Sequence, residues 1–350
     1  MRLKAWLAAG TWALCTLWSN WGLAADPLEI DVREIERFDR NVPDNRFGAL
    51  TFLGGLVLES DDARFKGLSG LDSIPEGEGE RLLIVSDDGY WITATLNTDA
   101  NEAPLSLSQA QIGTLTDQTG QPLEDKRLAD AEAITRVDDM VWVAFERNQP
   151  IRAYSLDGDQ PSGRAVHPIG AAPPLDGRWN QSAEAIVHVT QGPLTGETLL
   201  FLESPPRSAA APTAARILPD GSLMPFAVQR QDRFSITGAA MLPGGDIIVL
   251  ERRFAWTEGL FVRLRLLTAS DILSGAVQGR LLMHADETRQ IDNLEGIAIT
   301  EHPDGPIVTL ISDDNGNFFQ RTLLLRFQLT GDVSRLETPT LPNPVARPAL

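Results

Sequence analysis

Acidic residues close five short apolar segments of the sequence. The segments read LLIVSDD, VWVAFE, LLFLE, IIVLE and VTLISDD. Each follows another apolar stretch and a turn that contains Pro, Gly or Asp, and three of those first stretches carry a glutamate near their start: Glu132, Glu184 and Glu295. Carboxylates gathered from such positions could bind a divalent cation or activate water, provided that the fold brings them together.

The acidic segments belong to an internal repeat. Five modules share the plan of a signature, a short strand, a turn and a second strand, and they span 67–89, 131–158, 183–204, 236–253 and 294–315. The signature residues lie 62, 52, 54 and 57 positions apart, at Gly70, Glu132, Glu184, Gly238 and Glu295. In most modules a third strand follows, such as WITATL or TLLLRF. This period is typical of the four-stranded blades of a β-propeller.

The repeat predicts an all-β fold, a single β-propeller with five detectable blade modules. Short apolar runs bounded by turn residues favour strands, and no stretch requires a long amphipathic helix. Residues 48–60 lack the signature, so we expect them to add an outer strand to the last blade and close the ring, which removes exposed sheet edges. A sixth, degenerate blade built from residues 28–60 and the C-terminal tail stays open as an alternative.

Strand pairing predicts where the carboxylates lie. The first two strands of a blade form an antiparallel hairpin, so the start of one and the end of the other share one end of the blade. Because the innermost strand lines the central channel, the pairs should meet around one mouth. The expected pairs are Glu132 with Glu146, Glu184 with Glu203, Glu295 with Asp313 and Asp314, Ser69 with Asp87 and Asp88, and Thr237 with Glu251.

A ring of carboxylates needs cations, because like charges raise one another's pKa. Arginines just beyond the second strands could supply them, and so could Ca²⁺, which prefers oxygen ligands. The arginines are Arg147, Arg252, Arg253 and Arg321, with Arg207 near Glu203. A metal that polarises an ester, a carboxylate that activates water and arginines that hold an anion would together form a hydrolytic site. The competing interpretation is that the acids only cap turns or pair with neighbouring arginines.

Other chemical signals in the sequence are weak. The four histidines show no metal-ligand spacing, and Ser69 in GLSGL lacks the strand-turn-helix context of a nucleophile elbow. No glycine-rich phosphate loop or dinucleotide fingerprint is present. These observations disfavour a serine hydrolase triad and nucleotide binding.

The composition of the chain indicates which partners and which cellular compartment to expect. A net charge of −18 argues against nucleic acid and anionic lipid as partners. Residues 1–25 combine a positive start, an apolar run and small residues, which predicts a secretory signal peptide, with an uncleaved N-terminal anchor as the alternative. The only cysteine, Cys15, lies in this segment, so no disulfide or thiolate site is expected in the remainder. We expect a monomer in the periplasm or outside the cell, with a propeller domain at 26–340, a tail at 341–350 and no stable membrane insertion.

The motifs GLSGL, AEAI, NLEGIAI and above all ISDDNGNFFQRTLLLRF resemble those of phytase-like proteins, a family described as "esterase-like activity of phytase". The resemblance covers roughly residues 46–330, and the last motif is the most specific. It implies a β-propeller and hydrolysis of esters or phosphate esters. The fourth module departs from the pattern, because TGAA stands where other modules carry a glutamate.

The family motifs and the expected strand pairing together indicate which residues carry the chemistry. The residues expected to act in catalysis are Glu132, Glu184, Glu295, Asp313 and Asp314. The residues expected to bind a metal, with Ca²⁺ as the ion, are Asp87, Glu132, Glu146, Glu184, Glu203 and Asp313. The residues expected to bind the substrate are Arg147, Arg252, Asn315 and Arg321.

Two hypotheses from different classes follow. One is an exported, metal-assisted hydrolase whose partner is a small-molecule phosphate or carboxylic ester. The other is a non-catalytic propeller that binds a ligand or partner at its acidic mouth. A lactonase-like calcium propeller is a third, weaker possibility.

Overall fold

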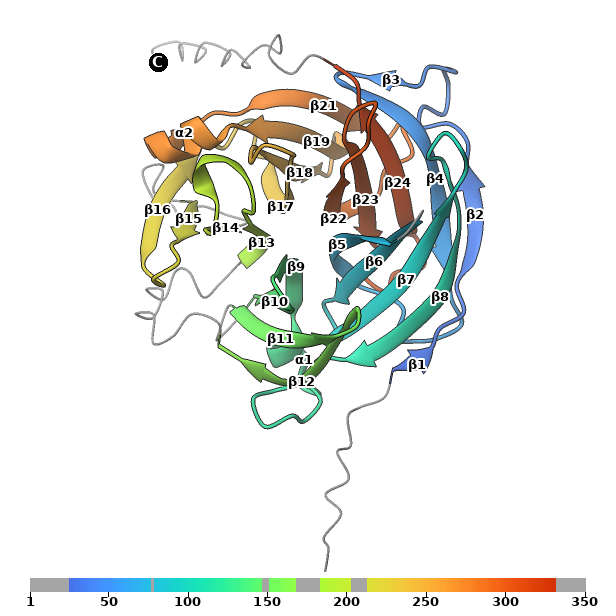
Figure 1. The fold of residues 1–350 in the computed structure, drawn as a ribbon. Coiled ribbons are helices and arrows are strands. Elements are labelled where there is room, and N and C mark those ends of the chain that lie inside the picture. The colour runs from blue at the N-terminus through green and yellow to red at the C-terminus, as the bar shows by residue number, and fades with distance from the viewer. Residues whose placement is uncertain (1–24, 77–78, 147–150, 168–182, 203–212, 332–350) are drawn as a thin grey trace, which may run out of the picture.

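The computed structural model describes residues 25–76, 79–146, 151–167, 183–202 and 213–331. Five antiparallel sheets surround a central channel, as Figure 1 shows. Each sheet is one blade, with its first strand beside the channel and later strands farther out. The predicted all-β propeller with five modules is therefore confirmed.

The first two blades lie in the first half of the chain. Blade one contains, from the channel outward, β5 (Leu68–Glu76), β6 (Gly79–Ser86), β7 (Tyr90–Thr98), β8 (Pro104–Thr114) and β1 (Asp26–Pro27). Blade two contains β9 (Ala131–Val137), β10 (Met140–Phe145), β11 (Ile151–Asp157) and β12 (Gln160–Val166). The short helix α1 (Lys126–Ala129) leads into blade two.

The other three blades follow in chain order. Blade three contains β13 (Ala183–His188), β14 (Thr198–Leu202), β15 (Ala214–Ile217), β16 (Leu223–Val228) and β20 (Ala276–Val277), the last one parallel to β16. Blade four contains β17 (Ser235–Met241), β18 (Ile247–Ala255), β19 (Gly259–Leu267) and β21 (Arg280–Asp286). Blade five contains β22 (Asn293–Thr300), β23 (Ile307–Asp313), β24 (Thr322–Leu329), β4 (Leu50–Glu59) and β2 (Asp31–Ile35), with β3 (Arg46–Phe47) paired to β4. The remaining elements are the 3-10 turn η1 (Gly192–Leu194) and helix α2 (Ala269–Ser274).

The ring closes in blade five, where strands from opposite ends of the chain pair. Strand β4 runs antiparallel to β24, from Leu58 opposite Thr322 to Leu50 opposite Leu329. The expected contribution of residues 48–60 to the last blade is thus confirmed. Because residues 31–35 and 46–59 form strands of this blade, the alternative of a sixth blade from residues 28–60 is wrong.

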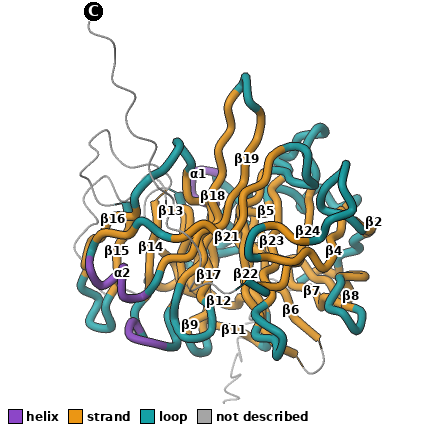
Figure 2. Tube along the Cα trace, turned by 90° about the horizontal axis from the view of Figure 1, so that it is seen from above, coloured by secondary structure: helices purple, strands orange, loops and turns teal. Residues whose placement is uncertain are grey.

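The second strands of the blades are almost entirely apolar because they are buried. Every residue of β14 and of β23 is buried, since these strands are covered on both faces by neighbouring blades. Within the described ranges, no helix is long and apolar enough to cross a membrane. In Figure 2 the long hairpin of β18 and β19 projects beyond the rest of the ring, and Trp256 at its tip is 93% exposed.

Each inner strand carries a β-bulge at the same place. The pairing of the first and second strands skips one residue in every blade, and the skipped residues are Ser69, Glu132, Glu184, Thr237 and Glu295. A bulge leaves its extra residue outside the ladder and redirects that side chain. In modules two, three and five the signature glutamate is this redirected residue, whereas in modules one and four the signature residues Gly70 and Gly238 stand one position after it.

The residue after each bulge is always Gly or Ala, namely Gly70, Ala133, Ala185, Gly238 and Gly296. Neighbouring inner strands approach closely here. A Cβ on Gly238 would lie 2.3 Å from the carbonyl oxygen of Glu295, and one on Gly70 would lie 2.9 Å from the Cα of Ala133. Small residues are required because they let the inner strands close around the axis.

A candidate acidic site at one mouth of the channel

Two sets of equivalent positions surround one mouth of the channel. The first set consists of the five bulge residues. On the inner strand, the residue just before each bulge pairs with a residue of the second strand. The second set consists of the residues that come directly after these partners on the second strands. These residues are Asp87, Glu146, Glu203, Arg252 and Asp313, of which Glu203 lies outside the described residues.

Glu251 does not belong to this mouth, contrary to the expected pairing with Thr237. Glu251 is the direct strand partner of Ile236 and therefore stands one position before the mouth position. Successive side chains on a strand point to opposite faces, so this one residue turns the carboxylate into the blade. There Glu251 is buried, and its oxygens accept bonds from Arg263 Nε at 2.6 Å and Arg265 Nε at 2.7 Å. Arg252 takes the mouth position instead.

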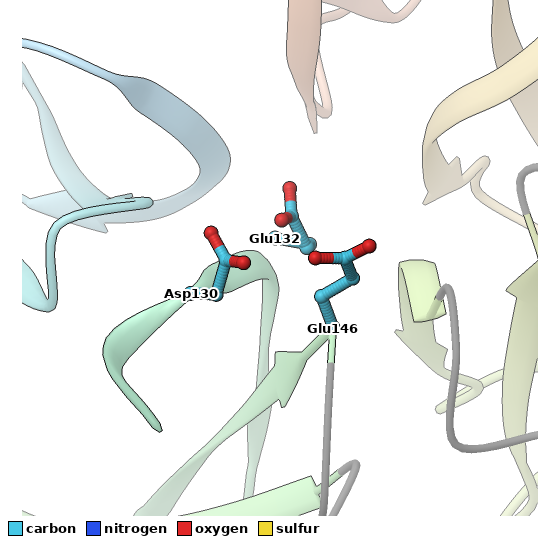
Figure 3. A group of neighbouring side chains, drawn as sticks. All are labelled: Asp130, Glu132 and Glu146. Atoms are coloured by element: carbon cyan, nitrogen blue, oxygen red, sulfur yellow. The ribbon is translucent and has the colours of Figure 1, made fainter. Parts of the chain in front are cut away.

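Three carboxylates of blade two come together at the mouth. One oxygen from each of Asp130, Glu132 and Glu146 lies within 4.8 Å of the other two, and Figure 3 shows the three groups. Glu132 is the bulge residue of β9, and Glu146 follows the end of β10. The backbone N–H of Glu146 donates to the Asp130 carbonyl at 2.9 Å and fixes the spacing of the two. This acidic cluster could hold a metal ion.

The charges of the cluster are strongly coupled. Burial raises the pKa of Glu132 to about 11, and repulsion from Glu184, Glu295, Asp130 and Asp87 adds to the effect. Burial likewise raises the pKa of Asp130 to about 7, assisted by a hydrogen bond and repulsion from Glu146. Repulsion from Glu184 and Glu295 is among the causes that raise the pKa of Glu132, so the three bulge glutamates lie near one another at the same mouth of the channel.

Blade five supplies a second group of polar side chains. Asn293 Nδ2 donates to Glu295 Oε1 at 2.8 Å and to Asp313 Oδ2 at 3.4 Å, while Arg252 Nη2 lies 3.7 Å from Glu295 Oε1. Burial raises the pKa of Glu295 to about 8, with repulsion from Asp313 as the next cause. Burial also raises the pKa of Asp313 to about 6. Asn293 Oδ1 is buried and has no hydrogen-bond partner in the described part of the chain.

Lysines balance the acids of blade one. Lys126 Nζ lies 2.7 Å from Asp87 Oδ2 and 3.0 Å from Asp88 Oδ1. Lys66 Nζ lies 2.8 Å from Asp88 Oδ2. This side of the mouth is therefore partly neutralised by cations of the chain itself.

The two bulge residues that are not glutamates join neighbouring blades. Ser69 Oγ donates to the carbonyl of Ala131 at 2.5 Å, and Thr237 Oγ1 donates to the carbonyl of Leu294 at 3.0 Å. Each acceptor immediately precedes a bulge glutamate. The hydroxyls thus hold in place the strands that present Glu132 and Glu295.

The turn after β23 uses its polar residues mainly for its own structure. Asp314 accepts from the backbone N–H of Gly67 at 3.3 Å and of Gly316 at 2.9 Å, and from Thr322 Oγ1 at 3.2 Å. Asn315 adopts a φ of 50°, and its N–H donates to Asp313 Oδ1 at 2.6 Å. These bonds fix the backbone beside Asp313.

Arg321 does not neutralise the two aspartates of its own turn. Its guanidinium lies 3.6 Å from Asp292 Oδ2 and donates to Gln290 Oε1 at 3.0 Å. Arg321 also lines a cavity of about 650 Å³ together with Arg40 and the exposed ring of Phe319. Asp292, which also lines this cavity, immediately precedes Asn293, whose amide contacts both Glu295 and Asp313.

The structure thus brings together most of the described residues that the sequence assigns to the site. Asp87, Glu132, Glu146, Glu184, Glu295, Asp313 and Arg252 occupy the two sets of mouth positions. Arg147 and Arg207 lie outside the described residues, as does Glu203. Arg253 lies 4.4 Å from the ring centre of Phe261 and 2.8 Å from Glu258, on the projecting hairpin.

Sequence reasoning missed three residues of the mouth: Asp130, Asn293 and Lys126. The first two precede a bulge glutamate by two positions, in DAE and NLE. The recurrence of a polar residue two positions before the glutamate in both modules was a usable signal, because equivalent positions of a repeat have equivalent places in the fold. Lys126 had no comparable signal, since it lies in a short helix between blades.

Comparisons with known proteins agree with the fold. The profile of the phytase-like family, "esterase-like activity of phytase", matches residues 63–316. No match was found among curated protein sequences.

Several solved structures resemble the chain at low identity. The allergen Mala s 1 of Malassezia sympodialis is 11% identical, with 85% of this chain and 96% of that chain covered and a TM-score of 0.41. The catalytic domain of the GH62 α-L-arabinofuranosidase of Coprinopsis cinerea is 10% identical, with 81% and 98% covered and a TM-score of 0.49. A gluconolactonase of Xanthomonas campestris is 11% identical, with 87% and 97% covered and a TM-score of 0.39. At this level of likeness, none of them carries an inference about the chemistry of this site.

Proposed function

The chain belongs to the phytase-like family, and on this premise we propose that it is a metal-assisted hydrolase of phosphate or carboxylic esters. The observation that carries the proposal is the convergence of three bulge glutamates and their neighbours on one mouth of the channel. We further propose that the protein is exported, because its first residues have the composition of a signal peptide.

The ligands of the metal would be Asp130, Glu132 and Glu146. Oxygens that share one Ca²⁺ ion at about 2.4 Å each are at most about 4.8 Å apart. The three carboxylates satisfy this limit. Their oxygens are hard ligands, and a cation would relieve the repulsion that raises the pKa of Glu132. A bound divalent cation would supply Lewis-acid polarisation of the ester.

Glu295 is the residue best placed to take a proton from water. Its pKa of about 8 lies close to neutrality, which suits a general base. Asn293 orients the carboxylate by donating to Oε1 at 2.8 Å, and Asp313 accepts from the same amide group. We therefore assign proton transfer to Glu295 and positioning to Asn293 and Asp313.

Arg252 would bind the negative charge of the substrate or of the developing oxyanion. It is partly buried, lies within 3.7 Å of Glu295, and its Nε has no hydrogen-bond partner among the described residues. A guanidinium presents donors in a planar fork that fits carboxylate and phosphate groups. Arg321, which lines a cavity of its own with Asp292, would contact a part of the substrate that extends beyond the mouth.

The test is hydrolysis of a panel of phosphomonoesters and acyl esters by the purified protein, with Ca²⁺ or with EDTA. We expect at least one class to be cleaved, with loss of activity in EDTA and recovery on addition of Ca²⁺. Glu295→Gln should lower the rate by about a hundredfold to ten-thousandfold, which is the usual contribution of a general base.

The matched control is Glu59→Gln on the outer strand β4, because its side chain is 72% exposed. This variant should hydrolyse the panel at the wild-type rate. No cleavage of any ester by the wild type would contradict the proposal and favour the non-catalytic binding propeller.

A further inference from the structure

A second cavity occupies the half of the channel beyond the bulges. Its volume is about 410 Å³, within the usual range for small-molecule sites. The same three positions of every inner strand line it, two to four residues after the bulge: 71–73, 134–136, 186–188, 239–241 and 297–299. The inner strands run side by side, so this cavity and the acidic mouth lie at different depths of one channel.

The walls of this cavity combine polar and apolar surface, and Ala239, Met241 and Ile299 are partly exposed apolar residues on its lining. Leu71, Ile134, Ile186 and Ile297 each come from a different blade. Among the charged or titratable groups on its lining are Asp72, Arg136, Asp138 and His188. A cavity that joins apolar side chains to a few directed polar groups can hold a small organic molecule.

The acid and the imidazole of this cavity already have partners. Asp72 accepts from the backbone N–H of Arg136 at 2.8 Å and of Ser73 at 2.7 Å. His188 Nδ1 lies 3.0 Å from Thr198 Oγ1, and burial lowers the pKa of His188, so the ring is neutral at neutral pH. Neither group requires a ligand.

The guanidinium of Arg136 is different. Its Nε is buried without a hydrogen-bond partner among the described residues, although its positive charge acts on the carboxylate of Asp72 nearby. A buried donor without an acceptor is costly, and guanidinium groups bind carboxylates through two parallel hydrogen bonds. The Nε of Arg136 therefore lacks a hydrogen-bond acceptor, and an anionic acceptor would suit the guanidinium best.

We propose that this cavity is a second ligand site, which takes a small organic carboxylate with an apolar body. The guanidinium of Arg136 would bind the carboxylate, and the apolar side chains of the inner strands would cover the rest of the molecule. A single negative charge fits better than a phosphate dianion, because the carboxylates of Asp72 and Asp138 line the same cavity. The site is separate from the acidic mouth and does not depend on hydrolysis there.

Hexanoate is a suitable probe, because it joins one carboxylate to a short apolar chain. Binding is measured by isothermal titration calorimetry in EDTA, so that a metal at the acidic mouth cannot bind the carboxylate. We expect saturable binding to the wild type and binding at least about tenfold weaker to Arg136→Gln, which removes the charge. Hexanol, which lacks the charge, should bind the wild type more weakly than hexanoate.

A second variant fills the cavity without touching the arginine. Ala239 lines the cavity from blade four, and Ala239→Leu should abolish hexanoate binding by occupying the space. Arg33→Gln is the matched control, since Arg33 lies on the outer strand β2 with a side chain 68% exposed, and it should bind like the wild type. Glu132→Gln should also bind like the wild type, because it changes only the acidic mouth. Thermal melting of each variant confirms that it is folded.

Two results would overturn the proposal. One is the absence of saturable hexanoate binding to the folded wild type. The other is equal binding by the wild type and by folded Arg136→Gln, which would show that the guanidinium is not the recognition group.

Discussion

Blades two and four have the same four-stranded plan and the same bulge, yet they present opposite chemistry to the channel. Blade two places Glu132 at the bulge and Glu146 after its second strand, whereas blade four places Thr237 and Arg252 at these positions. Blade four still contains an acid, Glu251, but one position earlier. The position of an acid in the strand pairing, more than its residue type, therefore determines whether its carboxylate points into the channel or into the blade.

The surroundings of the two acids follow from that difference. Glu251 is enclosed by Arg263 and Arg265, whose guanidinium groups donate to it within the blade. Glu132 faces other carboxylates, and within the described residues no hydrogen-bond donor or ion-pair partner contacts it. We infer that Glu251 stabilises the fold, whereas Glu132 reduces stability until a cation binds.

The largest effect that we expect is a difference in stability between variants of Glu251 and variants of Glu132. Glu251→Gln should lower the free energy of unfolding by about 3–5 kcal/mol, because it removes the buried carboxylate that pairs with both Arg263 and Arg265. Glu132→Gln, measured in EDTA, should leave that free energy unchanged or raise it, since Gln is neutral without having to bind a proton on folding. Urea denaturation of the two variants and the wild type provides the comparison. Equal destabilisation by both would contradict the distinction between the blades.

The pH dependence of stability should reflect the acidic mouth. Glu295 has a folded pKa of about 8 against an ordinary value of 4.5, so the folded state binds more protons than the unfolded state between these values. Stability in EDTA is therefore full below about pH 4.5 for this group and falls as the pH rises towards 8. Melting curves recorded from pH 5 to pH 8 should show this fall, and Ca²⁺ should reduce it. A rise in melting temperature over the same range in EDTA would contradict it.

Replacement of Arg252 tests the cationic side of the mouth. Arg252→Gln should lower kcat/KM by about tenfold to a hundredfold, as expected for one charge-assisted hydrogen bond. It should also raise the pKa of Glu295, because the positive charge of Arg252 lowers that pKa. The pH at which activity is half-maximal should then move upward. An unchanged pH profile would show that Arg252 does not act on Glu295.

The smallest effect is expected at Asp314. This residue accepts three hydrogen bonds in and around its turn, so Asp314→Asn should cost about 1 kcal/mol of stability and leave Ca²⁺ affinity unchanged. The sequence assigned Asp314 to catalysis. If Asp314→Asn lost activity as severely as Glu295→Gln, that assignment would hold and the turn would belong to the reaction site.

The repeat made the blades and the bulge glutamates predictable, because both recur at a regular period. The strand that closes the ring was predictable as well, since residues 48–60 lack a signature of their own. The position of Glu251 was not, because only the residue-by-residue strand pairing shows that this acid stands one position before the mouth position and so points to the other face.

Contacts between residues that lie far apart in the chain could not be predicted from the sequence either. Arg321 is next to the acidic turn along the chain, but it pairs with Asp292, which lies 29 residues earlier. Arg136 gave no signal, because an arginine after an apolar strand is common. Only the packing of five inner strands shows that Arg136 lines a cavity and that its Nε is buried without a hydrogen-bond partner among the described residues.

The central claim is that the carboxylates of blade two bind a divalent cation at the mouth of the channel. Calorimetric titration of Ca²⁺ into metal-free wild type and Glu132→Gln tests it most directly, with Glu59→Gln as the control. We expect saturable binding to the wild type and the control, with proton release because the raised pKa of Glu132 keeps its carboxyl protonated at neutral pH. Binding to Glu132→Gln should be at least about tenfold weaker. Equal Ca²⁺ affinity in all three proteins, or no binding to the wild type, would contradict the claim.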